Sequence, residues 1–191
     1  EDGYFLPKSI FSIYEKHEQN DVPLLLGWNE DDKIILRLLN AKEYVESIKN
    51  QFGKNAEAVL ALYPGNTDEE AAKSQGDLSR DQTFAVQGFA WANIQSAIGK
   101  SPVYVYHFNR KLPAASPESD FGAFHTGEVV YAYDNLFTVK RPWEKADHDL
   151  AKSMSTYWTN FVKTGNPNNT SLVKWPAYKI NTMQVLQLDK K

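Results

Sequence analysis

Two short runs of apolar residues stand out along the chain, and both predict strands. Residues 22–27 are continuous in apolar character and end in glycine, which is typical of a strand buried on both faces of a parallel sheet. Residues 103–108 are rich in β-branched and aromatic residues. Residues 183–188 alternate in character, so a third strand is expected near the end of the sequence.

Apolar residues spaced by a helical period separate these runs. Tyr44, Ile48 and Phe52 share one face of a helix over residues 41–52, and residues 146–164 carry a wide apolar stripe that indicates core packing. Further helical segments are expected at residues 9–16, 55–62, 67–73, 81–98 and 128–136, with residues 74–80 as a polar break and Asp81 as a cap. Strands that alternate with helices predict an α/β fold with a mostly parallel sheet and flanking helices.

Composition narrows the possible functions of the 191 residues. The hydrophobic share is 42%, enough for a sizeable core, and the net charge of -3 without a basic stripe disfavours nucleic-acid binding. No apolar run reaches the roughly 18 residues of a membrane span. With no cysteine, disulfides and thiol nucleophiles are excluded. The compartment stays open, and a periplasmic or secreted location is favoured over a cytoplasmic one.

Four polar residues, Asn29 to Asp32, follow the first expected strand. The carboxyl ends of parallel strands line the ligand crevice of open α/β sheets, so these acids are candidates for a functional site. The alternative is that they cap and charge the N-terminus of a following helix. Their spacing lacks the alternation of a calcium loop, and no metal site is expected.

One of the four histidines, His125, has the surroundings of a catalytic base. Gly122 and Gly127 allow unusual backbone angles around it, and it lies where a loop leads into an expected helix. A histidine base needs an acid on its far ring nitrogen. In α/β-hydrolases the order along the chain is nucleophile, acid, histidine, so a nucleophile would precede residue 1. The sequence contains no Gly-x-Ser-x-Gly motif.

Five ordered motifs resemble the C-terminal portion of type-B carboxylesterases, the family of bacterial para-nitrobenzyl esterases, animal carboxylesterases and cholinesterases. The resemblance covers nearly the whole chain. The motifs are Asp-Gly-x-x-Leu-Pro at residues 2–7, Val-Pro-x-x-x-Gly-x-Asn-x-Asp-Asp at 22–32, Tyr-x-Tyr-x-Phe at 104–108, Gly-Ala-x-His-x-x-Glu at 122–128, and Trp-x-x-Phe, Gly-Asn-Pro-Asn and Trp-Pro at 158–161, 165–168 and 175–176.

The resemblance implies specific roles for four residues. It implies that His125 is the catalytic base and that Asp32 is the acid, at a position where most members have glutamate. The shorter aspartate requires its turn to lie closer to His125. Lys33 stands where the family has glycine, which keeps Glu30 as a backup acid. Glu128 is expected to be structural, a buried partner of groups near the site.

The resemblance also implies a fold and a function. Residues 1–191 would be the C-terminal segment of a single α/β-hydrolase domain, from a bacterial protein, with the serine and the oxyanion loop upstream. We therefore expect part of a carboxylic ester hydrolase that uses an acyl-enzyme, needs no cofactor and is inactive alone. Its partners would be the ester substrate and the missing half of the protein, or a second copy. The alternative is a non-catalytic binding or adhesion module on the same fold.

Overall fold

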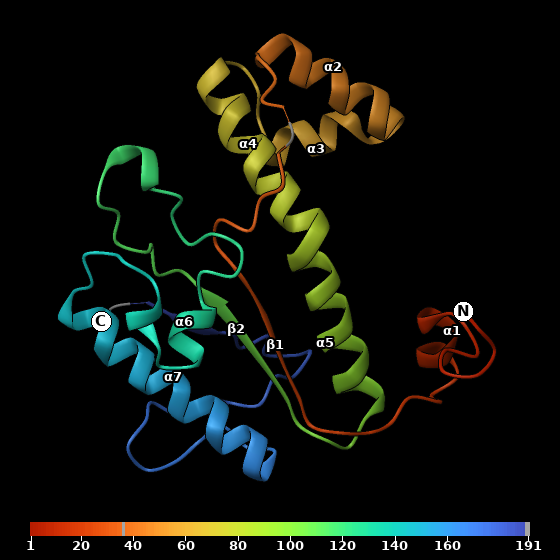
Figure 1. Ribbon diagram of the computed structural model, residues 1–191. Coiled ribbons are helices and arrows are strands. Elements are labelled where there is room, and N and C mark those ends of the chain that lie inside the picture. The colour runs from red at the N-terminus through yellow and green to blue at the C-terminus, as the bar shows by residue number, and fades with distance from the viewer. Residues whose placement is uncertain (36, 190–191) are drawn as a thin grey trace.

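The computed structural model describes residues 1–35 and 37–189, which contain one three-stranded sheet (Figure 1). The strands are β1 (Leu24–Asn29), β2 (Val103–Phe108) and β3 (Leu186–Leu188), in the order β1-β2-β3, and both pairs are parallel. Leu24 aligns with Val103, and Asn29 aligns with Phe108. The carboxyl ends of β1 and β2 therefore lie side by side, at the end of the sheet where the sequence places the acids.

Helices cover the two faces of this sheet. Ala92 of α5 (Val86–Ile98) packs with Val103 and Val105 of β2, whereas Tyr104 packs with Tyr157 of α7 (Lys145–Thr164) on the other face. Alternate residues of β2 thus point into opposite helical layers, as the two-residue period of a strand requires. Figure 1 shows α5 and α7 on opposite sides of the strands, so the α/β prediction is confirmed.

The other helices are shorter or lie beyond the end of the sheet. Tyr44, Ile48, Ala56 and Ala71 form a separate small core. Asn40 caps α2 in a capping box with Glu43, and the helix spans the residues that its apolar spacing predicted. The bounds are α1 (Ile10–Glu15), α2 (Ala41–Phe52), α3 (Ala56–Leu62), α4 (Asp68–Arg80) and α6 (Val129–Ala132).

The polar break expected at residues 74–80 is wrong. Helix α4 runs through these residues and continues, through a π-helical turn at Asp81–Ala85, into α5. The polar residues are helical because they have tertiary partners: the Ser74 hydroxyl donates to the Pro64 carbonyl at 2.6 Å, and the Gln75 amide donates to the carbonyl of Leu39 at 2.9 Å. Asp81 therefore does not cap a new helix.

Three other element boundaries differ from those expected. The strand expected at 183–188 begins only at Leu186, because Met183 lies in a turn with φ +46°. The helix expected at 128–136 ends at Ala132, close to Asp134 with φ +51°. Strand β1 runs from Leu24 to Asn29 instead of over residues 22–27, and it is half-buried over most of its length instead of buried on both faces. Among the described residues it has a strand neighbour on one edge only.

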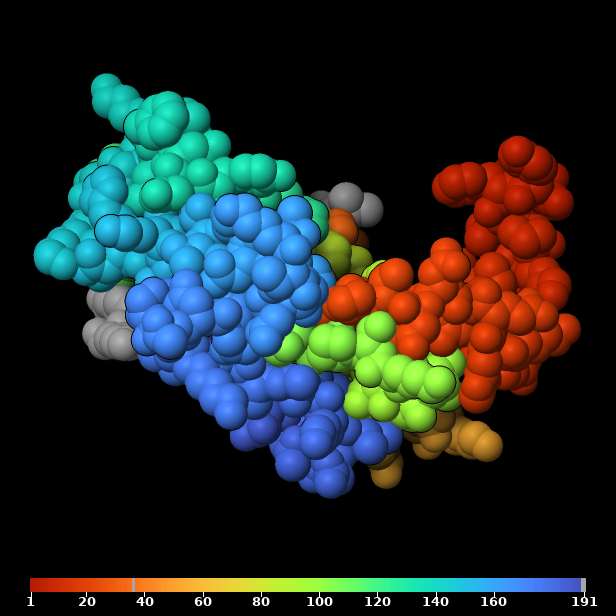
Figure 2. Space-filling model, turned by 90° about the horizontal axis from the view of Figure 1, so that it is seen from below, coloured from red at the N-terminus to blue at the C-terminus, as the bar shows by residue number. Residues whose placement is uncertain are grey.

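Several large apolar side chains are exposed on the N-terminal segment and on α5. Figure 2 shows the N-terminal residues, in red, projecting from the rest of the molecule. The exposed side chains include Tyr4, Phe5, Ile10, Phe11, Val22, Val86 and Trp91. None of the helices in the described part of the chain combines the length and the apolar character needed to cross a bilayer.

Candidate active site

The acids form a turn directly after β1 and do not cap a helix. Asn29 is the last residue of the strand, and Asp32 is buried three residues later. The backbone N–H of Asn29 donates to Oδ2 of Asp32 at 2.8 Å, which fixes that carboxylate beneath the strand end. The next helix begins at Ala41 and is capped by Asn40. The helix-capping alternative for these acids is therefore wrong.

A second turn carries His125 and pairs with the acid turn through Asp31. The Asp31 N–H donates to the Ala123 carbonyl at 3.0 Å, and the Ala123 N–H donates to Oδ2 of Asp31 at 2.8 Å. Gly122 adopts φ +66°, and a Cβ atom there would lie 2.1 Å from Oδ2 of Asp31. Glycine is needed at this position because both the backbone angle and the close approach exclude a side chain.

The paired turns bring His125 and Asp32 into contact. Nδ1 of His125 lies 2.9 Å from Oδ1 of Asp32. The Asp32 side chain is 5% exposed and the His125 side chain 57% exposed, so the carboxylate is enclosed and the imidazole faces outward. A carboxylate at Nδ1 favours a proton on that nitrogen and leaves Nε2 as an acceptor. The Asp32 side chain is shorter than a glutamate, and it reaches Nδ1 of His125 because the hydrogen bonds of Asp31 hold the two turns together.

Glu128 is linked to the same two turns through the side chain of Asn29. The Asn29 side-chain amide is buried and donates to the Phe124 carbonyl at 2.8 Å and to the Glu128 carboxylate. These bonds connect the end of β1 to both ends of the His125 turn. The structural role expected for Glu128 stays a prediction, which these contacts support.

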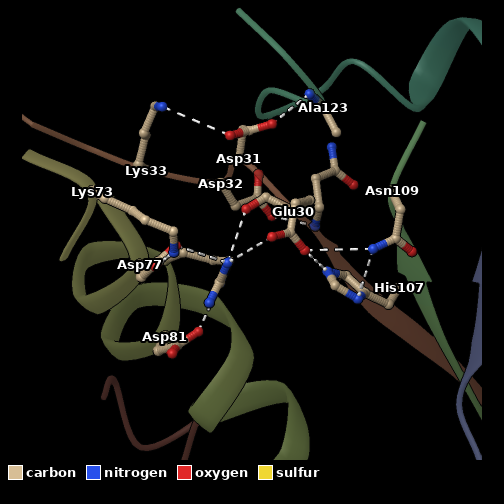
Figure 3. A network of polar contacts seen from close by, with 12 residues as sticks. Glu30, Asp31, Asp32, Lys33, Lys73, Asp77, Asp81, His107, Asn109 and Ala123 are labelled. Atoms are coloured by element: carbon tan, nitrogen blue, oxygen red, sulfur yellow. Dashed lines mark hydrogen bonds and ion pairs between the residues drawn. The ribbon is translucent and has the colours of Figure 1, made fainter. Parts of the chain in front are cut away.

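Glu30 points into a different polar network (Figure 3). Its Oε2 lies 3.1 Å from Nε2 of His107, and Nη1 of Arg80 donates to its Oε1 at 3.3 Å and to its backbone carbonyl at 3.1 Å. The structure thus brings Asp32, and not the backup acid Glu30, to His125. Nδ1 of His107 faces the amide of Asn109 at 3.2 Å.

Burial sets the protonation of this second network. It lowers the pKa of His107, an effect that Glu30 partly offsets and Arg80 reinforces. The neutral form of this imidazole is therefore favoured. Tyr63 donates to Asp81 at 2.7 Å, and burial together with that carboxylate raises the pKa of Tyr63 to about 12. This network holds the acid turn against α4.

Phe84 is a residue near His125 that the sequence did not single out. It lies in the π-helical turn, and its ring stacks on the imidazole with centroids 4.8 Å apart and an interplanar angle of 26°. Its only sequence signal is a place among the apolar residues of the helix expected at 81–98.

An open hollow of about 470 Å³ lies beside His125. Aromatic and charged side chains share its wall: it is lined by Asp31, Lys33, Lys111, Asp120, Phe121, Gly122, Phe124 and His125. Among residues 1–35 and 37–189, no group of three histidine or acidic side chains is arranged to hold a metal ion.

The complete chain, residues 1–191, matches the model of the carboxylesterase family. The chain belongs to the carboxylesterase family. The para-nitrobenzyl esterase of Bacillus subtilis (strain 168) is 31% identical over 198 residues, covering 98% of this chain and 38% of that protein. The medium-chain fatty acyl-CoA hydrolase precursor of Anas platyrhynchos is 28% identical over 211 residues, covering 98% and 37%.

Solved structures give the fold of this carboxylesterase chain. A thermophilic PNB esterase superposes with a TM-score of 0.71 at 28% identity, over 94% of this chain and 37% of that one. A second PNB esterase gives a TM-score of 0.68. The α/β-hydrolase fold and the type-B carboxylesterase resemblance are thus confirmed. The chain spans little more than a third of these relatives, and its C-terminal place, bacterial source and compartment stay predictions.

Proposed function

We propose that this chain supplies the general base and the acid of a serine carboxylic ester hydrolase. The observation that carries the proposal is the His125–Asp32 pair: an enclosed carboxylate bonded to Nδ1 of an outward-facing imidazole. Among the described residues no hydrogen bond reaches Nε2 of His125, so this nitrogen is open to a serine hydroxyl. The named relatives are hydrolases and esterases, so the comparisons do not favour the binding-module alternative.

The proposed reaction has two acyl-transfer steps. A serine from outside residues 1–191 attacks the ester carbonyl while its proton passes to Nε2 of His125, and the imidazolium then gives that proton to the leaving alcohol. Water, activated by the same nitrogen, attacks the acyl-enzyme and releases the carboxylic acid. Asp32 stabilises the imidazolium and keeps its Nδ1–H in place throughout.

The 191 residues alone are expected to be inactive. They contain no Gly-x-Ser-x-Gly motif to supply an exposed nucleophile. Donors to the developing oxyanion provide a large part of the catalysis in such enzymes, and the family's glycine-rich loop has no match here. Both must come from further chain of the same protein.

The test uses the full-length protein that contains this chain. His125→Ala should reduce kcat for short acyl esters by at least about 10⁴-fold, because removal of the base disables both steps. The matched control is His148→Ala, since His148 is exposed on the first turn of α7, away from the acid turn. Unchanged turnover in His125→Ala would contradict the proposed function.

A second part of the proposal concerns what covers the unpaired edge of β1 and the exposed side chains of α5. The exposed apolar side chains of Val86 and Trp91 lie on α5, which packs on β1. We propose that further chain of the same protein covers this surface, and that the 191 residues alone self-associate through it. Light scattering tests this: a monodisperse monomer of the 191 residues at high concentration would contradict the second statement.

A further inference from the structure

The ring plane of His125 is held by one hydrogen bond and one aromatic contact. The bond from Nδ1 to Asp32 fixes a single point of the imidazole, and rotation about that bond would still swing Nε2 away from a reacting group. The 57% exposure of the side chain means that little else encloses it. The stacked ring of Phe84, at 4.8 Å and 26°, restrains the remaining rotation.

A π-helical turn determines where Phe84 lies. The N–H of Val86 donates to the carbonyl of Asp81, five residues earlier, so the turn holds one residue more than an α-helical turn. This extra residue changes the direction in which Phe84 projects relative to its place in a regular helix. π-helical turns inside long helices are frequent at functional sites.

The same stretch of helix is bonded to the acid turn. Arg80, four residues before Phe84, donates from Nη1 to the backbone carbonyl of Glu30 at 3.1 Å. Its Nε donates to Asp81 at 2.7 Å, and Tyr63 donates to the other oxygen of that carboxylate. Residues 80–84 therefore contact the turn that carries Asp32 and the ring of His125, which ties the acid and the base to one rigid element.

We propose that Phe84 is a positioning residue for His125: its ring holds the imidazole in the orientation that directs Nδ1 to Asp32 and Nε2 to the reacting serine. This inference rests on the proposed function and deepens it. Loss of the ring should leave substrate binding intact and lower the fraction of time that Nε2 is aligned for proton transfer. Misplacement of a reacting group by about 1 Å can cost roughly 100-fold in rate.

The kinetic test compares Phe84→Leu and Phe84→Tyr with the wild type in the full-length protein, on a short-chain p-nitrophenyl ester and an alkyl ester. Phe84→Leu should lower kcat by about 10- to 100-fold with KM within about twofold. Phe84→Tyr keeps the stacked face and should stay within about threefold. The control Phe89→Leu removes a ring from α5 that contacts Tyr178 instead, and should leave kcat unchanged. A change in KM alone, or equal kcat values, would overturn the proposal.

An NMR measurement separates this inference from the proposed function. In protein labelled at histidine, Phe84→Leu should remove the ring-current shift of the His125 carbon-bound protons and broaden their signals, whereas Phe84→Tyr should preserve both. Unperturbed His125 signals in Phe84→Leu would overturn the inference even in an active enzyme. Full activity of His125→Ala would instead overturn the proposed function, while the NMR result still decides whether Phe84 fixes the ring.

Discussion

Nδ1 of His125 lies 2.9 Å from Oδ1 of Asp32, although the two residues are 93 positions apart in the sequence. The contact depends on two turns at the carboxyl ends of parallel strands, joined by the backbone of Asp31 and Ala123. Each turn supplies only one residue of the His125–Asp32 contact. The level ends of β1 and β2 bring the turns together, and the bond from Asn29 to Asp32 aims the carboxylate.

Asp32→Asn should lower kcat by about 10³- to 10⁴-fold, because an amide no longer holds the imidazole in the tautomer that leaves Nε2 as acceptor. The variant keeps the volume of the side chain, so KM should change little. Ester hydrolysis by the full-length protein is the measurement. Glu30→Gln is the matched control, since Glu30 bonds to His107 and Arg80 instead. Equal losses in the two variants would contradict the assignment of Asp32 as the acid.

Local pattern was sufficient for much of the fold. The apolar runs located β1 and β2, and the spacing of Tyr44, Ile48 and Phe52 gave the bounds of α2, because a capping residue and a glycine mark its ends. The His125–Asp32 contact could be expected because the family resemblance implied that these two residues are the base and the acid. The hydrogen bonds that hold each turn, such as the one from Asn29 to Asp32, could not be predicted, because no periodicity in the sequence indicates them.

Other features depended on tertiary contacts that no local pattern contains. Ser74 and Gln75 appear polar enough for a break, yet their side chains bond to the carbonyls of Pro64 and Leu39 and remain helical. The stack of Phe84 on His125 needs the extra residue of the π-helical turn, which a 3.6-residue period cannot indicate. The half-buried state of β1, which among the described residues has a strand neighbour on one edge only, is likewise not indicated by its apolar run.

Gly122→Ala should destabilise the protein more than Gly53→Ala. Both glycines have positive φ, +66° and +52°, which residues with a side chain rarely adopt, so each alanine is strained. A Cβ at Gly53 meets no atom within 4 Å, whereas at Gly122 it would displace Asp31. Urea unfolding should therefore show the larger loss for Gly122→Ala, with a loss of activity that Gly53→Ala lacks. Equal unfolding free energies would contradict the close approach of the two turns.

Arg110→Met should cost about 3–5 kcal/mol of stability, because it leaves the fully buried carboxylate of Asp147 without its cation. Arg110 donates to both oxygens of that carboxylate, at 2.7 and 3.0 Å, and Tyr131 donates to it at 2.7 Å. The measurement is the free energy of unfolding. The exposed pair of Lys145 and Asp149 offers the control, and Lys145→Met should change stability little. A small effect of Arg110→Met would contradict this account of the cluster.

The pKa of His107 predicts a specific loss of stability in mild acid. Burial holds it below the ordinary value of 6.5, with Glu30 opposing and Arg80 reinforcing the shift. Below pH 6.5 the unfolded chain therefore binds more protons at this residue than the folded chain does, so the free energy of unfolding falls as the pH decreases from 6.5 towards the folded-state pKa.

Replacing the titrating ring should remove this dependence. His107→Gln should be less stable than the wild type at pH 7.5, since it loses the ring contact with Trp28, but its free energy of unfolding should fall less between pH 7 and 5. His148→Gln, at an exposed position on α7, is the control and should retain the wild-type slope. Denaturant unfolding at several pH values measures both. A slope in His107→Gln as steep as in the wild type would show that another group carries the acid sensitivity.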